Sequence, residues 1–454
     1  MKTHERVSAL KPHGSQGRSI PEKRKSTDGR TRNGSGPTVA HALHPVVTSL
    51  LGHDIPVRLE FWDDSTLGSD DRAGSVLVTS PRALRRLMWA PGELGLARAF
   101  VTGEVELRGD LVGLLRAMRD TAAREQLRIP VVRALRAAHR VGALGLPPEA
   151  PAEEASPFGR RHSRRRDATV IHHHYDISNE FYELVLGPSM TYSCARYTSD
   201  SVSLEEAQQA KHDLVCRKLG LDQEPGMRLL DVGCGWGSMA IHAARTYRAQ
   251  VLGVTLSDAQ AERARQRVKE AGLEGQIEIR IQDYRDLVGE QFDAISSIGM
   301  FEHVGRSNME TYFESMHKVL APRGRFLNHA ISSVGGSRLG SRSFIGRYVF
   351  PDGELLDVGD VVLAMERAGF EVRDVESLRE HYAKTLRAWV GNLQASWDQA
   401  ATLVGARRAR VWLLYMAACA NGFVDGGISI HQVLGVRPGQ SGESRMPLTR
   451  IGWS

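Results

Sequence analysis

The chain has 454 residues, enough for two or three domains, and 41% hydrophobic with 25% charged residues is typical of a globular protein with an adequate core. No window approaches the roughly 18 apolar residues of a membrane span, and the N-terminus lacks the apolar core of a signal peptide. Four scattered cysteines form no C-x-x-C pair, which argues against a disulfide framework or a zinc site. We expect a cytoplasmic protein without a bound metal.

Residues 1–40 hold nine Lys or Arg and three acids, so this segment alone carries the chain's net charge of +6. It is rich in Gly and Ser with almost no periodic apolar content, which predicts a disordered tail. Residues 160–166 add five arginines. Such basic runs are attracted to nucleic acid or to acidic lipid headgroups; a solvated linker is the alternative interpretation.

Residues 41–143 are predicted to form a small α+β domain. Val57, Leu59 and Phe61 alternate as in a strand, with residues 75–79 as its partner. Ser80 and Pro81 are suited to the N-cap and first turn of a helix that runs to residue 89. Residues 111–143 look helical, and a Pro- and Gly-rich break then predicts a linker over 144–168.

Residues 169–438 alternate between predicted strands and helices, followed by a tail over 439–454. The strands are expected at 228–232, 250–254, 277–282, 292–297 and 325–331. Helices are expected at 259–272, 308–320, 385–400 and 407–420, the last two as additions beside the sheet. This order predicts an α/β domain with a doubly wound, Rossmann-like parallel sheet.

A glycine-rich turn follows the first of these strands. Gly233, Gly235 and Gly237 supply the positive φ and close backbone approach that a ligand at a strand's carboxyl end requires, and Asp231 precedes them. The G-x-G-x-G spacing resembles the first motif of class I S-adenosylmethionine-dependent methyltransferases more than a dinucleotide fingerprint. An ordinary strand–turn–helix is the plain alternative.

Two further strand ends fit a nucleotide-type cofactor. The second strand ends in residues 253–257, where Thr255 stands in the place of the usual ribose-binding acid, followed by Leu256 and Gln260. The third ends at Asp283 and Tyr284, where a carboxylate can accept from an adenine amino group. For Asp283, a helix N-cap or loop acid is an equally good interpretation.

Five ordered segments carry a more specific resemblance: 173–182 (HHYDISNEFY), 190–195 (MTYSCA), 299–305 (GMFEHVG), 381–389 (HYAKTLRAW) and 417–423 (AACANGF). They are similar to motifs of the cyclopropane-fatty-acyl-phospholipid synthase family. The resemblance runs from about residue 57 to the C-terminus and includes the N-terminal domain of the phospholipid-acting members. It implies S-adenosylmethionine as the cofactor, with Tyr192 and Ser193 also in its site.

The same resemblance implies methyl transfer to the cis double bond of an unsaturated phospholipid acyl chain, giving a cyclopropane. The resulting carbocation must lose a proton without meeting water, which requires a dry apolar channel, aromatic faces and one base. Family members hold bicarbonate as that base. The residues implied are Glu302, His329, Ile331, Tyr382 and the backbone of Cys194. Glu302 could instead be a helix N-terminal charge, and Cys419, treated as catalytic in the family, could be a buried inert thiol.

One departure from the family pattern leaves the product open. Asn328 and Ala330 flank His329, where family members more often carry Leu-His-Thr-Ile. The alternative product is a 10-methylene branch, which a separate reductase could convert to a 10-methyl branch. The expected partners are unsaturated phospholipids, the anionic inner face of the plasma membrane and a second copy of the chain.

Two other functions are less consistent with the sequence. A nucleic-acid methyltransferase would draw on the basic segments, but neither the Asn/Asp-Pro-Pro-aromatic motif nor a Pro-Cys nucleophile is present; we therefore expect no nucleic-acid partner. A lipid-binding protein without activity is disfavoured, because Glu302, His329 and Tyr382 are all retained.

Overall fold

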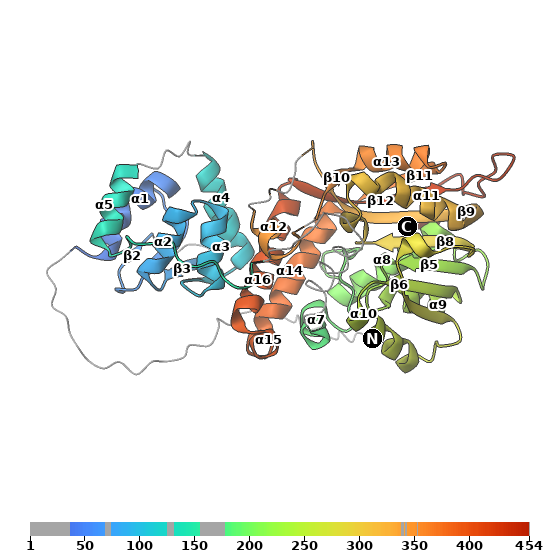
Figure 1. Cartoon of the computed structure of the whole chain (residues 1–454), viewed down its shortest axis with the longest axis horizontal. Helices are drawn as coiled ribbons and strands as arrows, with labels where there is room; N and C mark the ends of the chain where they lie inside the picture. The colour runs from blue at the N-terminus through green and yellow to red at the C-terminus, as the bar shows by residue number, and fades with distance from the viewer. Residues whose placement is uncertain are drawn as a thin grey trace, which may run out of the picture.

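The computed structural model describes residues 37–68, 74–124, 131–154, 178–336, 340, 343–351 and 353–453. Figure 1 shows an elongated molecule in which a small N-terminal domain and a larger sheet domain lie on either side of a group of helices, α14–α16. Most of the predicted tail, the basic cluster at 160–166 and the motif residues up to 177 lie outside the described residues.

The N-terminal domain has a four-stranded sheet in its described part, with strand order β2-β1-β3-β4. Its strands are β1 (Arg58–Phe61), β2 (Thr66–Leu67), β3 (Gly74–Val78) and β4 (Val105–Gly109). Its helices are α1 (Val39–Leu51), α2 (Pro81–Trp89), α3 (Glu93–Val101), α4 (Leu111–Arg124) and α5 (Val131–Arg140). The alternating residues predicted in β1 are buried in the core and face the helices.

Local signals in this domain behave as expected. β3 pairs with β1, in parallel, and the Ser80 hydroxyl accepts from the backbone N–H of Arg82 at the start of α2. The helical region predicted over 111–143 consists of two helices, α4 and α5. One boundary is wrong: α1 begins at Val39, inside the segment predicted to be disordered, because Thr38 caps it and its first turn packs into the core.

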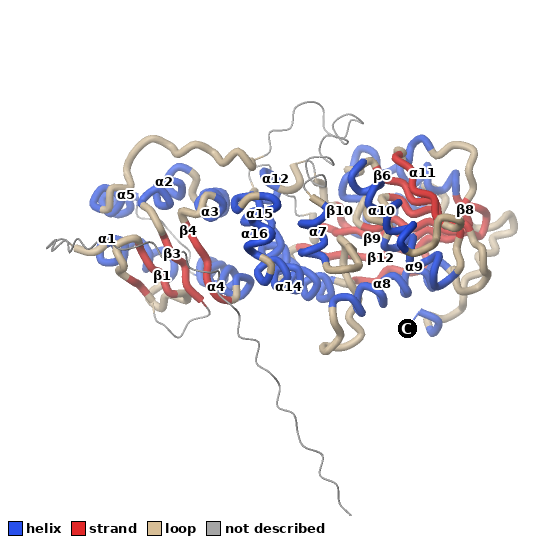
Figure 2. The backbone as a smooth tube through the Cα atoms, turned by 90° about the horizontal axis from the view of Figure 1, so that it is seen from below, coloured by secondary structure: helices blue, strands red, loops and turns tan. Residues whose placement is uncertain are grey.

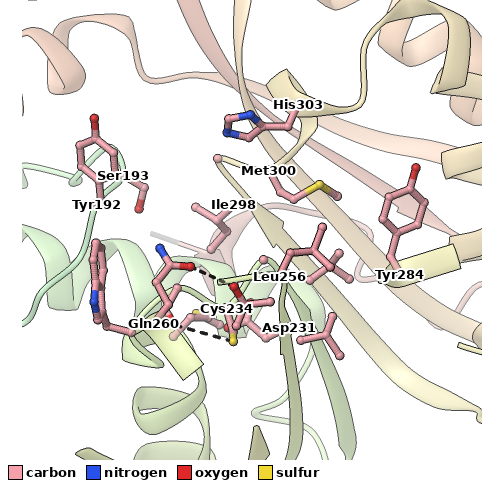
Figure 3. Close-up of a pocket in the computed structure, with 18 of the residues that line it drawn as sticks. Tyr192, Ser193, Asp231, Cys234, Leu256, Gln260, Tyr284, Ile298, Met300 and His303 are labelled. Atoms are coloured by element: carbon pink, nitrogen blue, oxygen red, sulfur yellow. Dashed lines mark hydrogen bonds between the residues drawn. The ribbon is translucent and has the colours of Figure 1, made fainter. Parts of the chain in front are cut away.

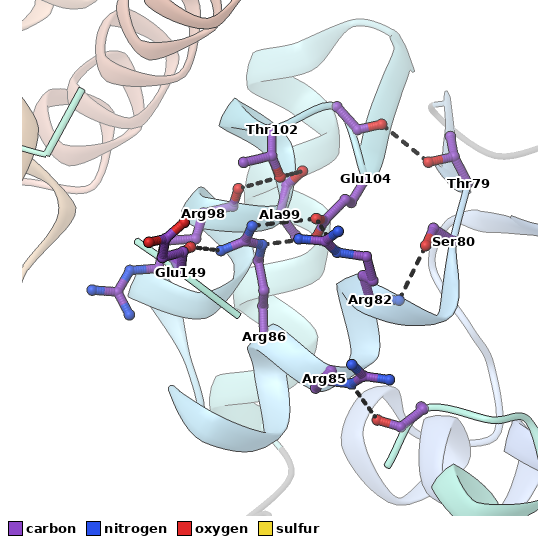
Figure 4. Close-up of polar contacts among 12 residues, drawn as sticks. Thr79, Ser80, Arg82, Arg85, Arg86, Arg98, Ala99, Thr102, Glu104 and Glu149 are labelled. Carbon is purple, nitrogen blue, oxygen red and sulfur yellow. Dashed lines mark hydrogen bonds and ion pairs between the residues drawn. The ribbon is translucent and has the colours of Figure 1, made fainter. Parts of the chain in front are cut away.

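Charged side chains of the N-terminal domain form ion pairs and hydrogen bonds within the domain and with the segment that follows it (Figure 4). The buried Arg86 guanidinium donates to the Glu104 carboxylate, with Nε 2.7 Å from Oε2, and to the Glu149 carbonyl at 2.7 Å. Arg98 pairs with Glu154 at 2.9 Å, and Glu154 also accepts from Arg347 of the sheet domain at 3.1 Å. The described part of the predicted linker therefore lies against both domains.

The second domain has an eight-stranded sheet in its described part, with strand order β11-β12-β9-β8-β5-β6-β7 and β10 beside β9. Its strands are β5 (Arg228–Val232), β6 (Gln250–Thr255), β7 (Ile277–Ile281), β8 (Phe292–Ile298), β9 (Leu320–Ser333), β10 (Leu356–Asp357), β11 (Glu371–Ser377) and β12 (Ile428–Val436). All five predicted strands are confirmed. They pair in parallel, which confirms the doubly wound, Rossmann-like sheet; the structure adds β12, which runs antiparallel to both β9 and β11.

Helices cover both faces of this sheet (Figure 2). The described helices of this domain are α7 (Asn179–Leu186), α8 (Leu204–Leu219), α9 (Ser238–Tyr247), α10 (Asp258–Glu270), α11 (Met309–Val319), α12 (Phe344–Tyr348), α13 (Val358–Arg367), α14 (Arg379–Ala395), α15 (Trp397–Val404) and α16 (Ala406–Val424), with 3₁₀ turns at Tyr284–Asp286, Phe301–His303, Arg306–Asn308 and Ile451–Trp453. The helix predicted over 385–400 is two helices, separated at Ser396.

The two domains share one apolar core. Its members run from Val39 of α1 through Phe181 of α7 to Trp412 of α16 without interruption. Polar contacts reinforce the junction: Asn421 of α16 donates to the Val112 carbonyl at 2.9 Å. No helix in the described part of the chain is long and apolar enough to cross a bilayer.

Candidate active site

The glycine turn after β5 opens the first cavity at the carboxyl ends of the parallel strands, where the strand order reverses between β8 and β6. Gly233 has φ +75°, and a Cβ there would lie 2.9 Å from Met300 Cβ, so only glycine fits. Gly237 is not among the described residues that line this cavity. It precedes α9 in the left-handed conformation, which makes it a helix-start residue.

The structure brings the other predicted cofactor residues together (Figure 3). They line one cavity: Tyr192, Ser193, Asp231, Gly233, Gly235, Thr255, Leu256, Gln260, Asp283 and Tyr284. Three different strand ends and the loop before α8 therefore converge, although the contributing residues span nearly 100 positions of sequence. This convergence is the geometry expected for a class I methyltransferase fold.

Two of these side chains are engaged locally. The Thr255 hydroxyl donates to Gln260 Oε1 at 2.9 Å, which fixes Gln260 at the cavity wall. The Asp283 carboxylate accepts from the Arg285 backbone N–H and guanidinium, both within 2.9 Å. Asp283 therefore has the capping role that the sequence left open, while it still lines the cavity.

Buried charge lies at the bottom of the cavity. Asp231 accepts from Ser296 Oγ at 2.7 Å through Oδ1, whereas Oδ2 has no partner among the described residues. Burial raises the pKa of Asp231 to about 6. Opposite it, Lys211 of α8 donates to Ser193 Oγ at 2.9 Å, and burial lowers the pKa of this amine to about 7. Sequence reasoning missed Lys211, because it lies mid-helix outside any motif.

A second, smaller cavity adjoins the first and shares Tyr192 and Ser193 with it. Glu302 enters from the 3₁₀ turn after β8, and its Oε1 accepts from the Ile331 backbone N–H at 2.7 Å. Its Oε2 is buried without a partner in the described part of the chain. Burial raises the pKa of Glu302 to about 7, so the group can take up or release a proton near neutrality.

His329 of β9 faces the same cavity and is kept neutral. Burial holds its pKa well below the usual value. Gln432 Nε2 lies 3.2 Å from His329 Nδ1; an amide donor there leaves Nδ1 as the acceptor and places the ring proton on Nε2. That Nε2 atom has no partner among the described residues. Glu302 Oε2 is thus an acceptor, and His329 Nε2 a donor, without a partner among the described residues. A small oxyanion that carries a proton fits both.

The remaining predicted catalytic residues occupy different places. Ile331 and Tyr382 line the small cavity. The thiol of Cys194 contacts the carbonyl of Leu378 at 3.6 Å, away from the cavity lining, and burial raises its pKa above the ordinary range. Asn328 and Ala330, the departures from the family pattern, are absent from the lining residues described, because alternation along β9 turns them from the face that carries His329.

A third cavity of about 670 Å³ continues from the second and is almost wholly apolar. The two share Ile331, Phe350, Leu355, Tyr382 and Tyr415. Its far wall comes from the N-terminal domain and its near wall from α14 and α16. The apolar N-terminal contributors are Leu50, Leu51, Leu96, Ala97, Leu115 and Met118, and the charged Glu93 and Arg119 of the same domain also line the cavity. Cys419 also lines this cavity, where burial raises its pKa to about 12, so the thiol is un-ionised at neutral pH.

A family model described as mycolic acid cyclopropane synthetase matches residues 162–433. The chain belongs to this family. It is an S-adenosylmethionine-dependent methyltransferase, and when bound that cofactor supplies an electrophilic methyl group. The buried Asp231, the glycine at 233 and the converging strand ends fit such a cofactor in the first cavity.

Two relatives align with this chain over most of their own length. A Mycobacterium tuberculosis protein named "Probable fatty acid methyltransferase" is 43% identical over 87% of this chain and 94% of its own. The Escherichia coli K12 cyclopropane-fatty-acyl-phospholipid synthase is 40% identical over 62% of this chain and 71% of its own.

Solved structures match the second domain. The Mycobacterium tuberculosis cyclopropane synthase MmaA2 is 33% identical, with a TM-score of 0.57, over 61% of this chain and 99% of its own. The mycolic acid cyclopropane synthase CmaA1 complexed with SAH and CTAB is 36% identical, with a TM-score of 0.56, over 59% of this chain and 98% of its own.

Proposed function

We propose that this enzyme transfers a methyl carbon from S-adenosylmethionine to the cis double bond of an unsaturated phospholipid acyl chain, and that the product is a cyclopropane. The observation that carries the proposal is the series of three adjoining cavities. A cofactor cavity shares wall residues with the small cavity that holds Glu302 and His329, and this in turn shares wall residues with a large apolar one. An acyl chain in the third cavity would present its double bond beside Tyr382 and Glu302.

The aromatic residues at the junction suit a cationic reaction. Tyr192 lies between the cavities, with its hydroxyl 3.2 Å from that of Tyr415 and its ring 5.4 Å from Trp389. Tyr382 packs on Phe423 at 4.7 Å. Electron-rich ring faces stabilise a nearby positive charge, and the apolar walls exclude the water that would quench it.

Deprotonation needs one base, and the second cavity fits bicarbonate in that role. Neutral His329 would donate from Nε2 to the anion, while Glu302 Oε2 would accept its proton. The Tyr382 hydroxyl is un-ionised, since burial raises its pKa well above the usual value, and it is a second donor. Ile331, which lines the cavity, and the backbone of Cys194 complete the set of holding residues that the family resemblance implies. Glu302, with its pKa near 7, can accept the proton that the base acquires.

Two products remain distinguishable by experiment. Loss of the proton from the incoming methyl closes the ring, whereas loss after a hydride shift leaves a 10-methylene branch that a separate reductase could convert to a 10-methyl branch. We favour the ring, because Asn328 and Ala330 face away from the cavity that holds Glu302 and His329. Membership of the family, with relatives named both as fatty acid methyltransferase and as cyclopropane synthase, is compatible with either.

The substrate sets the proposed location and partners. Phospholipid acyl chains are reached from a bilayer surface, so we place the enzyme in the cytoplasm, at the anionic inner face of the plasma membrane. The basic tail over 1–40 would contribute attraction to that surface. A homodimer is compatible with this placement.

The test uses liposomes of oleoyl phospholipids, methyl-labelled S-adenosylmethionine and added RNA. We expect label in the acyl chains, a mass gain of one methylene unit, and fragmentation that reports a ring. A methylene branch would refute the ring and keep the lipid assignment. Label only in RNA would refute the lipid assignment, and no label in either would refute the proposed reaction and favour a lipid-binding protein without activity.

A further inference from the structure

The N-terminal domain presents a surface in which exposed apolar side chains lie beside arginines. We propose that this surface, the α5 face, inserts into the headgroup region of an anionic phospholipid bilayer. It consists of Trp89, Val131, Val132, Leu135, Leu144 and Leu146, flanked by Arg133, Arg136 and Arg140. The inference rests on the proposed function for its choice of partner and adds the docking surface.

Exposure sets these apolar residues apart. Val131, Val132 and Leu135 of α5 are 63%, 60% and 47% exposed, and Leu146 is 84% exposed. Large apolar side chains gathered on a surface mark a binding site more often than isolated ones do. Trp89 is 57% exposed, and its indole N–H donates to the Gly145 carbonyl at 3.0 Å, which holds this ring beside the Leu144–Leu146 segment.

The arrangement around α5 is that of a helix lying in a membrane interface. Ala137 and Ala138 are buried and attach the helix to the domain. At 3.6 residues per turn, Val131, Val132 and Leu135 fall within about 100° of arc, which also holds the exposed His139, and the three arginines occupy roughly 60° that begin about 40° beyond it. Apolar side chains on one side, with basic ones on the adjoining side, match apolar insertion and phosphate contact.

Charge identifies the kind of bilayer. Residues 131–146 contain three arginines and no acid, so this surface is complementary to anionic headgroups. Each basic group near such a surface adds to the attraction. A protein partner would also cover apolar residues, but it would not account for the one-sided charge or for an exposed indole, which favours the membrane interface.

The position of α5 links the surface to the substrate cavity. α5 lies at the outer end of the molecule and packs on α1 in both views (Figures 1 and 2). Leu50 and Leu51 at the end of α1 line the apolar cavity. The helix that supports the α5 face thus also forms the wall of the proposed acyl site.

The test is sedimentation of the full chain with vesicles of phosphatidylglycerol and phosphatidylcholine. The double variant Leu135→Ser/Leu146→Ser is compared with the control Leu363→Ser/Val288→Ser in the other domain. Leu363 and Val288 are 45% and 85% exposed, which matches the 47% and 84% of Leu135 and Leu146. We expect the first variant to lose about tenfold or more in vesicle affinity, because inserted leucines contribute strongly, and the second to bind like the wild type.

A second variant, Arg133→Gln/Arg136→Gln/Arg140→Gln, keeps the apolar residues; it should lose affinity for anionic vesicles and leave the weaker binding to neutral ones unchanged. Equal binding by wild type and both α5 variants would overturn the proposal, as would equal losses in the control variant. Turnover of phospholipid in detergent micelles separates the docking surface from the proposed function, because micelles need no bilayer insertion. The α5 variants should therefore keep the wild-type turnover in micelles. A wild type without turnover would refute the function, while the vesicle result would still decide the docking surface.

Discussion

Replacing Glu302 by glutamine tests whether a buried carboxyl group in the second cavity is maintained at a cost in stability. Oε1 of this side chain accepts from the Ile331 N–H at 2.7 Å, and a glutamine oxygen can keep that bond. Burial raises the pKa of the wild-type group from 4.5 to about 7. Glutamine resembles the neutral acid, so the variant removes the ionisation without removing the shape.

The magnitude follows from the pKa difference. At about 1.4 kcal/mol for each pH unit between the two pKa values, ionising Glu302 costs the native state on the order of 3 kcal/mol. Because the folded pKa is the higher one, the wild type is favoured most below pH 4.5 and loses this stability as the pH rises to about 7. Between pH 5.5 and pH 8.5 the loss is about 2 kcal/mol.

Urea unfolding of both proteins at these two pH values measures the effect. The stability of Glu302→Gln relative to the wild type should increase by about 2 kcal/mol from pH 5.5 to pH 8.5, while turnover falls at least about a hundredfold and cofactor affinity is retained. Glu310→Gln, at an exposed position of α11, is the control and should show neither change. A stability difference that is the same at both pH values would refute the buried, high-pKa carboxyl.

Three further predictions concern other residues. Gln432→Leu should lower kcat at least about tenfold with cofactor affinity unchanged, because the bond that fixes the His329 tautomer is lost; calorimetry and steady-state kinetics measure both, and an unchanged kcat contradicts the tautomer argument. Cys419→Ala should keep kcat within about twofold, because a thiol with a pKa of about 12 is not a nucleophile at pH 7; a large loss would restore a catalytic role. Arg86→Met should destabilise the N-terminal domain by up to about 3 kcal/mol, because Glu104 loses its buried partner and keeps only the exposed Arg82 at 3.3 Å; a urea midpoint like that of the wild type would show that the pair contributes little.

Sequence patterns predicted the parts of the fold that depend on local signals. β5 and β6 are apolar runs that end in glycine or a small polar residue, and both were located to within a residue. β12 was missed, because it is buried on both faces and so lacks the alternation of a half-buried strand, although a turn at Asp425, Gly426 and Gly427 separates it from α16. Its antiparallel pairing with β9 is a long-range property that no local pattern encodes.

The same distinction applies to the site. Gly233 and Asp231 belong to a compact motif and were predicted from it, whereas Lys211 lines the first cavity from the middle of α8 and Gln432 contacts His329 from β12, 103 positions further along the chain. The family resemblance predicted Glu302 and His329, but not the hydrogen-bond partners that determine where each side chain carries its proton. Those partners emerge only when the sheet is assembled.

Because residues of both domains enclose the apolar cavity, its dimensions belong to neither domain alone. Leu96 and Met118 come from one side and Leu414 from the other. Exchanging N-terminal domains between relatives would therefore replace only the cavity wall that this domain supplies. Such chimaeras should have a preference for acyl-chain length that lies between those of the two parents. Laboratory evolution toward longer or shorter chains has two separate sets of positions on which to act.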